Sequence, residues 1–228
     1  MTKNKKTHTI IVSDLHLGSK MSRSRALIKL LKSYNFKKLI LLGDIFDSLD
    51  FTDLTQQQWD FLTYLTKLSR QVKVRWVEGN HDQGLIKITS LLMGIKVYKK
   101  YTWEYQGKKY LAVHGHQFDR FIINNTVLSW IISFLYSIAQ RLDMKNRRIV
   151  NYFKKNNHGW LRLSKKVASS AIFYGKLYRA DYVFCGHTHQ AMYKYDHKIH
   201  YYNAGCWTDI PSSYLIIDEN GVCLEYAK

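Results

Sequence analysis

The sequence is poor in proline, cysteine and acidic residues, and each shortage excludes a class of protein. One proline and 12 glycines in 228 residues exclude collagen-like and Pro/Gly-rich disordered chains. Cys185, Cys206 and Cys223 form no CxxC pair, so we expect reduced thiols without a disulfide partner rather than a secreted disulfide scaffold. The 17 acidic residues are outnumbered by 35 Lys and Arg, and the formal net charge of +18 points to anionic partners.

Long apolar runs are also missing. The longest apolar stretch, residues 127–139, contains three serines and is shorter than the roughly 20 residues that span a bilayer. Residues 1–11 lack the apolar segment of a signal peptide, so we expect a cytoplasmic protein. The length suits a single α/β domain that covers residues 1–228.

Short β-rich runs are present, and each one ends in a cluster of polar residues. The runs cover residues 8–13, 38–42, 72–77, 110–113 and 182–185. They lead into DLH (14–16), GDIFD (43–47), EGNHD (78–82), HGH (114–116) and GHTH (186–189). Helical patterns at 25–34 and 57–69 lie between the early runs, which is typical of an α/β sheet. Because such sheets bind ligands at the carboxyl ends of their strands, the clusters predict a functional site.

An insertion separates the last two clusters. His114 and His187 are 73 residues apart, about twice the spacing of the earlier clusters, so we place a helical insertion at about 118–180. Residues 120–180 contain 12 Lys and Arg but one acid, Asp143, and residues 126–142 are apolar on nearly every side. A helix that is apolar all round is buried or contacts an apolar partner.

After residue 189 the chain alternates again between apolar and polar residues. The alternating segments are 200–202, 214–218 and 222–226, and a turn falls at 219–221. This pattern predicts an antiparallel pair that closes the edge of the sheet.

Taken together, the polar clusters predict a two-metal site, although each cluster alone fits a helix cap or a tight turn. Seven nitrogen and oxygen donors at neighbouring strand ends need a cation, since the carboxylates would otherwise repel one another. Residues i and i+2 of an extended segment face the same way, so Asp14 with His16, and His187 with His189, can each present two donors to one cavity. A set of His, Asp and Asn without thiolate suits Mn²⁺, Fe²⁺ or Zn²⁺.

Such a site has a recognisable chemistry. Two divalent ions about 3.5–4 Å apart bind phosphoryl oxygens, lower the pKa of a water between them and stabilise an in-line displacement. Asp44 is the natural bridging carboxylate. His81 is placed to protonate the leaving oxygen or to stabilise charge, and Asp47 or Asp82 is available to orient its ring.

The five motifs in this order resemble those of the calcineurin-type metallophosphoesterase superfamily, over essentially the whole chain outside the insertion. The resemblance implies a four-layer αββα sandwich with a dinuclear metal centre and a helical lid insertion. It implies one metal held by Asp14, His16 and His189, a second held by Asn80, His114 and His187, and Asp44 between them. It further implies that His81 is the active-site histidine and that Asp47 is its supporting carboxylate.

Within the superfamily the chain is most similar to the UDP-2,3-diacylglucosamine hydrolase group. The similarity lies in SDLHLGS (13–19), the compact length, Trp207, and the basic, apolar insertion between HG and GHTH. It implies hydrolysis of a lipid A precursor diphosphate at an anionic membrane surface, two Mn²⁺ ions and a lid over the acyl chains. The best-known members carry Arg and Asp where this chain has His81 and His116. The candidate substrate-binding residues are His116, Arg120, Trp130, Arg162, Lys165 and Lys166.

Two other functions compete with the lipid hydrolase. A metallophosphodiesterase acting on a nucleotide or nucleic acid would use the +18 charge to hold phosphates and the 17 tyrosines to stack bases. A non-catalytic scaffold of the same fold is a more distant alternative, since all seven ligand positions are filled here.

Overall fold

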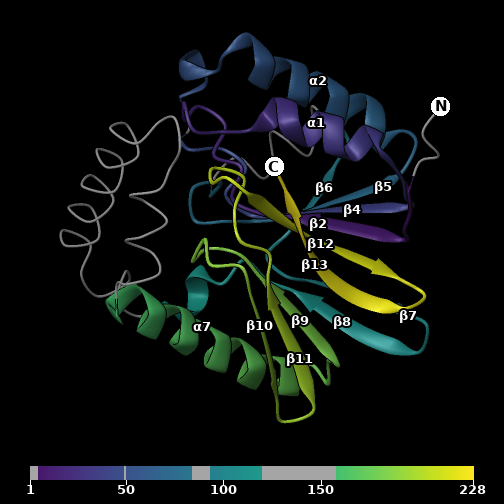
Figure 1. Cartoon of the computed structure of the whole chain (residues 1–228), viewed down its shortest axis with the longest axis vertical. Helices are drawn as coiled ribbons and strands as arrows, with labels where there is room; N and C mark the ends of the chain where they lie inside the picture. Colours follow the sequence, from purple (N-terminus) through teal and green to yellow (C-terminus); the bar gives the residue numbers. More distant parts are fainter. Residues whose placement is uncertain (1–4, 49, 84–92, 120–157) are drawn as a thin grey trace.

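Two β-sheets lie face to face, with helices on both outer sides (Figure 1). The structure is a computed structural model, and it describes residues 5–48, 50–83, 93–119 and 158–228. The first sheet has six strands in the order β13-β12-β2-β4-β5-β6, and the second has five in the order β10-β11-β9-β8-β7. Helices α1 and α2 cover the first sheet and α7 covers the second, as Figure 1 shows.

The element bounds follow this layering. The first sheet consists of β13 (Gly221–Ala227), β12 (Ser212–Asp218), β2 (Thr9–Val12), β4 (Lys38–Leu42), β5 (Lys73–Val77) and β6 (Lys96–Tyr98). The second consists of β10 (Met192–Asp196), β11 (Ile199–Asn203), β9 (Tyr182–Cys185), β8 (Lys108–Ala112) and β7 (Tyr101–Tyr105). The helices are α1 (Ser24–Lys32), α2 (Gln56–Ser69) and α7 (His158–Leu177), with short 3₁₀ turns η1 (Phe51–Asp53) and η2 (His116–Phe118). A separate short pair joins β1 (Lys5–Lys6) to β3 (Tyr34–Asn35).

Three apolar clusters fill the three interfaces between the four layers. Along β2, Ile10 and Val12 pack in the cluster under α1 and α2, while Ile11 packs in the cluster between the two sheets. Strands whose two faces are both buried read as continuous apolar runs, which explains the TIIV and KLILL segments. The third cluster joins the second sheet to Ala168 and Ile172 of α7. The four-layer αββα architecture expected from the motif order is therefore present.

The strand directions bring the polar clusters to one end of the sandwich. Strands β2, β4, β5 and β6 are mutually parallel, as are β8, β9 and β11, and the motifs follow the carboxyl ends of β2, β4, β5, β8 and β9. One prediction needs correction, because these strand ends belong to two sheets rather than to neighbouring strands of one. The antiparallel pair of β12 and β13 closes the edge of the first sheet, as predicted.

Five strands were not predicted: β1, β3, β6, β7 and β10. They are very short or partly exposed, as in the YTWEY and MYKYD segments, so they lack a continuous apolar run. Helix α7 lies within the predicted insertion (118–180), whereas the apolar segment 126–142 lies outside the described residues. None of the described helices combines the length and the apolar character needed to cross a membrane.

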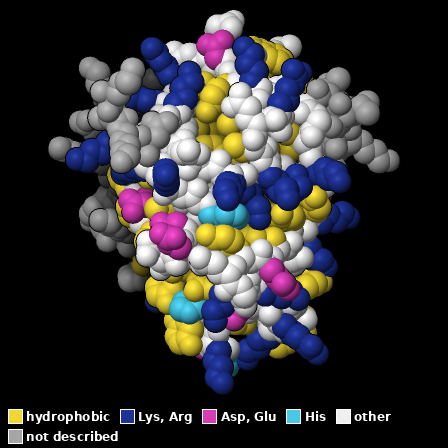
Figure 2. Space-filling view, turned by 90° about the vertical axis from the view of Figure 1, so that its right-hand side faces the viewer, with side chains coloured by type: hydrophobic (Ala, Val, Ile, Leu, Met, Phe, Trp, Pro, Cys, Tyr) yellow, Lys and Arg dark blue, Asp and Glu magenta, His cyan; other side chains and the backbone are white. Residues whose placement is uncertain are grey.

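Basic side chains gather at the end of the sandwich that carries the amino ends of the parallel strands (Figure 2). Lys38 lies there with its Nζ 5.0 Å from the ring centroid of Trp103. Its burial, together with the nearby charges of Lys73 and Arg75, lowers the pKa of Lys38 to about 8. This basic end is therefore separate from the end where the motifs converge.

The layer between the two sheets gives a first prediction. Phe184 is fully buried and its ring stacks on Trp103 and Tyr110, so Phe184→Ala should lower the free energy of unfolding by about 3–5 kcal/mol. Urea denaturation followed by fluorescence measures this loss. Phe173→Ala is the matched control, because Phe173 is 64% exposed and its removal should change stability by no more than about 0.5 kcal/mol. Equal effects of the two substitutions would contradict the layered packing.

Candidate metal centre

The first cluster of ligand atoms joins the two sheets through Asp14, His16 and His189. Asp14 and His16 follow β2, and His189 follows β9. Asp14 Oδ1 lies 3.1 Å from His189 Nε2 and 4.0 Å from His16 Nε2, and the two imidazole Nε2 atoms are 3.2 Å apart. Asp14 is fully buried and His16 is buried, so these atoms face one another inside the protein.

The second cluster consists of Asp44, His114 and His187. Asp44 Oδ2 lies 3.2 Å from His114 Nε2. The His114 ring is held by its other nitrogen, because Nδ1 donates a hydrogen bond to the carbonyl oxygen of Leu42 at 2.8 Å. His114 Nε2 is consequently directed at Asp44.

Asn80 belongs to the loop that wraps Asp44. His81 N donates to Asp44 Oδ1 at 2.9 Å, and a Cβ on Gly79 would lie 2.2 Å from the same oxygen, so only glycine allows this approach. Asn80 Oδ1 is buried, and no hydrogen-bond partner is found for it among the described residues. A buried carbonyl oxygen without a donor is a suitable ligand for a cation.

The ligand residues have an unexpected backbone conformation. The φ angles are positive at Asp14 (53°), His16 (48°), Asp44 (49°), His187 (66°) and His189 (50°). The loops therefore turn through the left-handed region instead of continuing as extended segments. Asp14 and His16 still share one cluster, as their i, i+2 spacing predicts. His187 and His189 separate into different clusters, so the prediction is wrong for that pair. Such strained conformations concentrate at functional sites.

Asp47 contacts two histidines through different groups. Its carboxylate Oδ1 accepts from His16 Nδ1 at 3.0 Å, while its main-chain carbonyl oxygen accepts from His81 Nδ1 at 2.7 Å. The sequence predicted that a carboxylate of Asp47 or Asp82 orients His81, but the main-chain carbonyl oxygen of Asp47 makes this contact. Asp82 instead binds the backbone, because its carboxylate accepts hydrogen bonds from the amides of Ile45 and Phe46.

The electrostatics of the site favour cations. Burial alone would raise the pKa of Asp44, but His114, His81 and His16 hold that pKa well below its usual range. Burial also opposes ionisation of Asp14, yet the charge of His189 and its hydrogen bond lower the Asp14 pKa. In return, Asp44 and Asp14 outweigh burial and raise the pKa of His114 to about 9. The two carboxylates thus stay ionised and attract positive charge.

The donor geometry fits divalent cations. Neighbouring ligand atoms around an ion with bonds of 2.0–2.1 Å lie about 2.9–3.4 Å apart. The Asp14–His189, His16–His189 and Asp44–His114 separations of 3.1, 3.2 and 3.2 Å fall in this range. The clusters therefore suit divalent metal ions.

Of the other predicted site residues, one lies near the second cluster, three lie on α7 and two lie outside the described residues. The His116 ring centroid lies 5.5 Å from that of His114, and burial together with the charges of His114 and His187 lowers the pKa of His116 to about 4. Arg162, Lys165 and Lys166 are exposed on α7. Arg120 and Trp130 lie outside the described residues.

Sequence reasoning missed two side chains that contact histidines of the clusters. Asp119 Oδ2 lies 3.3 Å from His187 Nε2, and Cys206 makes a side-chain hydrogen bond to His189 that helps raise the pKa of His189. Asp119 comes five residues after His114, and that spacing was the only available signal. For Cys206 the sequence contains no comparable signal.

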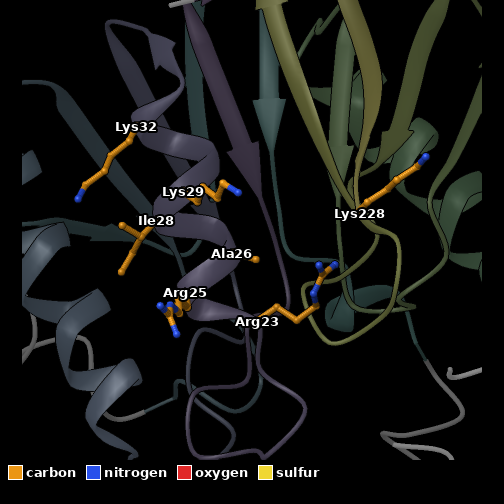
Figure 3. A pocket seen from close by; sticks show the side chains of 7 residues that line it. All are labelled: Arg23, Arg25, Ala26, Ile28, Lys29, Lys32 and Lys228. Atoms are coloured by element: carbon orange, nitrogen blue, oxygen red, sulfur yellow. The ribbon is translucent and has the colours of Figure 1, made fainter. Parts of the chain in front are cut away.

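Two clefts are lined by residues other than the ligand residues. One of about 740 Å³ runs along α1 (Figure 3) and is lined by Arg23, Arg25, Ala26, Ile28, Lys29, Lys32 and Lys228. A second, of about 460 Å³, lies between η2 and α7, with Phe118 and Phe173 among its lining residues. The second cleft begins next to the HGH motif.

Comparison with known families identifies the chain. Residues 7–191 match the model of the calcineurin-like phosphoesterases. The chain belongs to the calcineurin-like phosphoesterase family. The family and the His/Asp clusters together indicate a site for divalent metal ions.

Solved structures show the same calcineurin-like fold at low sequence identity. The phosphoesterase YfcE from E. coli is 14% identical with a TM-score of 0.54, and the match covers 94% of this chain and 90% of that one. An archaeal phosphodiesterase is 15% identical with a TM-score of 0.51, over 96% and 98% of the two chains. Vps29 from Chaetomium thermophilum is 10% identical with a TM-score of 0.51, over 96% of each chain. No curated protein sequence matches in a direct comparison.

The close approach of the GHTH loop to β2 gives a second prediction. A Cβ on Gly186 would lie 1.8 Å from Ser13 Oγ and 2.4 Å from Asp14 Oδ2, so Gly186→Ala must displace Asp14. Metal affinity should fall by about 10-fold or more, as measured by titrating Mn²⁺ into chelator-treated protein. In the control Gly107→Ala, the new Cβ meets no described atom within 4 Å, and metal affinity should stay unchanged despite a backbone cost of about 1–2 kcal/mol at a φ of +70°. Wild-type affinity in Gly186→Ala would refute the arrangement.

Proposed function

We propose that the protein is a two-metal hydrolase of phosphodiester or pyrophosphate bonds, and that its preferred substrate is a UDP-2,3-diacylglucosamine-like lipid diphosphate. The observation that carries the hydrolase proposal is the pair of His/Asp clusters, which are built from loops that follow strands of both sheets. Asp14, His16 and His189 would hold one cation, and Asn80, His114 and His187 the other, with Asp44 shared between them. Mn²⁺ is the proposed metal, and Fe²⁺ or Zn²⁺ fits the same donor set.

When bound, the two cations would supply positive charge to the phosphoryl oxygens and lower the pKa of the attacking water. Asp44 is suited to the shared position because its two carboxylate oxygens face different groups. Oδ2 faces His114 Nε2, while Oδ1 accepts the amide of His81. These two contacts together restrain rotation of the Asp44 side chain.

His81 would act on the leaving group. Its Nδ1 donates to the Asp47 carbonyl oxygen, and its ring lies edge-on to His16 at a centroid distance of 5.1 Å. With Nδ1–H committed in this way, the imidazolium form carries its second proton on Nε2, at the exposed side of the ring. His81 is therefore a general acid that donates from Nε2 to the departing oxygen.

Features of α7 support an acylated, anionic substrate. Arg162, Lys165 and Lys166 are exposed cations on the half of the helix that precedes Val167, and Val167 packs near Gly115 beside the metal centre. The apolar cleft between η2 and α7 adjoins the same region, and Phe173 is 64% exposed there. Cations beside exposed apolar surface suit a diphosphate that carries acyl chains. They also suit attachment to an anionic membrane surface.

A phosphodiesterase acting on a nucleotide or nucleic acid is the second candidate. The observation that favours it is the basic end shown in Figure 2, where Lys and Arg side chains gather on the surface. Such a concentration of positive charge attracts the phosphates of a nucleic acid. A steep salt dependence of DNA binding would favour this candidate, and weak binding at low salt would count against it.

A pair of substitutions tests the hydrolase proposal. Asp44→Ala should abolish hydrolysis of a small chromogenic phosphodiester and lower the metal content, because the shared carboxylate is lost. His81→Ala should lower kcat by about 10²–10⁴-fold while both cations remain bound. Elemental analysis and steady-state kinetics measure the two effects. Full activity and metal content in Asp44→Ala, or loss of metal in His81→Ala, would contradict the assigned roles.

The cations of α7 test the substrate. The triple replacement of Arg162, Lys165 and Lys166 by alanine should raise KM for UDP-2,3-diacylglucosamine about 10-fold or more, since each lost phosphate contact costs a charge-assisted hydrogen bond. KM for the small chromogenic diester should change little. Lys176→Ala is the control, because Lys176 is an exposed cation in the last turn of the same helix. Equal effects on both substrates would remove the lipid diphosphate from consideration.

A further inference from the structure

A buried carboxylate outside the five motifs lies against one of the candidate metal ligands. Asp119 is fully buried, and its Oδ2 is 3.3 Å from His187 Nε2. The side chains of both residues are almost inaccessible, at 0% and 6% exposure. An ionised carboxylate is costly to bury unless hydrogen-bond donors or positive charge compensate it. The His187 imidazole is such a donor for Asp119.

The chain between His114 and Asp119 is shaped to make this contact. Gly115 adopts a φ of 115°, and η2 then turns the chain, with the amides of Phe118 and Asp119 bonded back to the carbonyls of Gly115 and His116. The Phe118 ring packs against Tyr174 of α7 at a centroid distance of 5.5 Å. This turn lets His114 face Asp44 while Asp119, five residues later, faces His187.

The contact determines which nitrogen of His187 is free. With Nε2 directed at the Asp119 carboxylate, the proton of the neutral ring lies on Nε2 and the lone pair lies on Nδ1. His187 lies in the cluster of Asp44 and His114. The Nδ1 lone pair is then the atom available to a cation in that cluster.

The same logic operates in the first cluster. There the Asp47 carboxylate accepts from His16 Nδ1, which leaves His16 Nε2 for a cation. Carboxylates that accept the second ring proton of a ligating histidine orient the ring and raise its basicity. Each cluster therefore has one such carboxylate: Asp47 for the first and Asp119 for the second.

We propose that Asp119 is a positioning residue that sets the affinity of the second metal site. It holds His187 as the Nε2–H tautomer with Nδ1 directed at the cation, and it does not touch the cation or the substrate. This inference rests on the two-metal hydrolase proposed above. It goes beyond that proposal by making the affinity of the second site adjustable independently of the first.

The test compares Asp119→Ala, which removes the acceptor, with Asp119→Asn, which keeps an acceptor oxygen without charge. Calorimetric titration of Mn²⁺ into chelator-treated Asp119→Ala should show one site weakened by about 10–100-fold and the other unchanged. Asp119→Asn should give a smaller loss. The Mn²⁺ concentration for half-maximal hydrolysis of the chromogenic diester should rise by the same factor, while kcat at saturating Mn²⁺ stays within about twofold of wild type.

Asp181→Asn is the matched control. This substitution also removes one negative charge. In the wild-type protein the Asp181 carboxylate accepts a hydrogen bond from the amide of Lys109 at the start of β8 and contacts no ligand histidine that the structure describes. Neither metal affinity should change in this variant. Thermal unfolding of the chelator-treated proteins checks that the variants are folded, and where Asp119→Ala fails to fold, the affinities of Asp119→Asn decide.

Three results for Asp119→Ala would overturn the inference about Asp119. They are unchanged Mn²⁺ affinity at both sites, equal weakening of both sites, and a fall in kcat at saturating Mn²⁺. If the wild-type protein binds two Mn²⁺ ions and the Asp119 variants bind both with wild-type affinity, the inference about Asp119 alone is overturned. A wild-type protein that binds no Mn²⁺ would overturn the two-metal hydrolase and the inference together.

Discussion

The structure depends on two carboxylates, Asp14 and Asp44, that are buried where the ends of two β-sheets meet. Their exposed fractions are 0% and 2%, and burial acts to raise both pKa values. Imidazoles from both sheets offset that cost and hold both groups ionised. A protein interior tolerates two such anions side by side only when positive charge is supplied to them. That requirement explains why histidines from β8 and β9 meet aspartates from β2 and β4.

Bringing these groups together imposes unusual demands on the backbone. A Cβ on Gly43 would lie 2.2 Å from the His114 ring, so the loop after β4 can contact that ring only through a glycine. Five ligand residues adopt positive φ, which costs of order 1–3 kcal/mol each. The three apolar clusters supply the packing that offsets this strain. The packing of the sandwich therefore compensates for the conformational strain of the loops.

The sequence allowed prediction of the fold order and of the residues brought to the site, but not of how they are held. Strands β2 and β4 were predictable because both faces are buried and their sequences are apolar throughout. Strands β7 and β10 were not, because partly exposed strands mix tyrosines with charged residues. The positive φ angles, the Asp47 carbonyl that orients His81 and the contact of Asp119 depend on tertiary placement. A pattern of residue types carries no signal for such contacts.

The two carboxylates that support the clusters differ in their surroundings, and this difference has a consequence for function. The Asp47 side chain is 47% exposed, whereas that of Asp119 is 0% exposed. Solvent screens the interaction of Asp47 with His16, while the interaction of Asp119 with His187 takes place in a low dielectric and is stronger per charge. Under the hydrolase proposed above, a leaving group would depart at His81, which lies beside the first cluster and is exposed. The second cluster adjoins the η2 turn that packs on α7, so the part of the substrate that determines specificity would bind on that side.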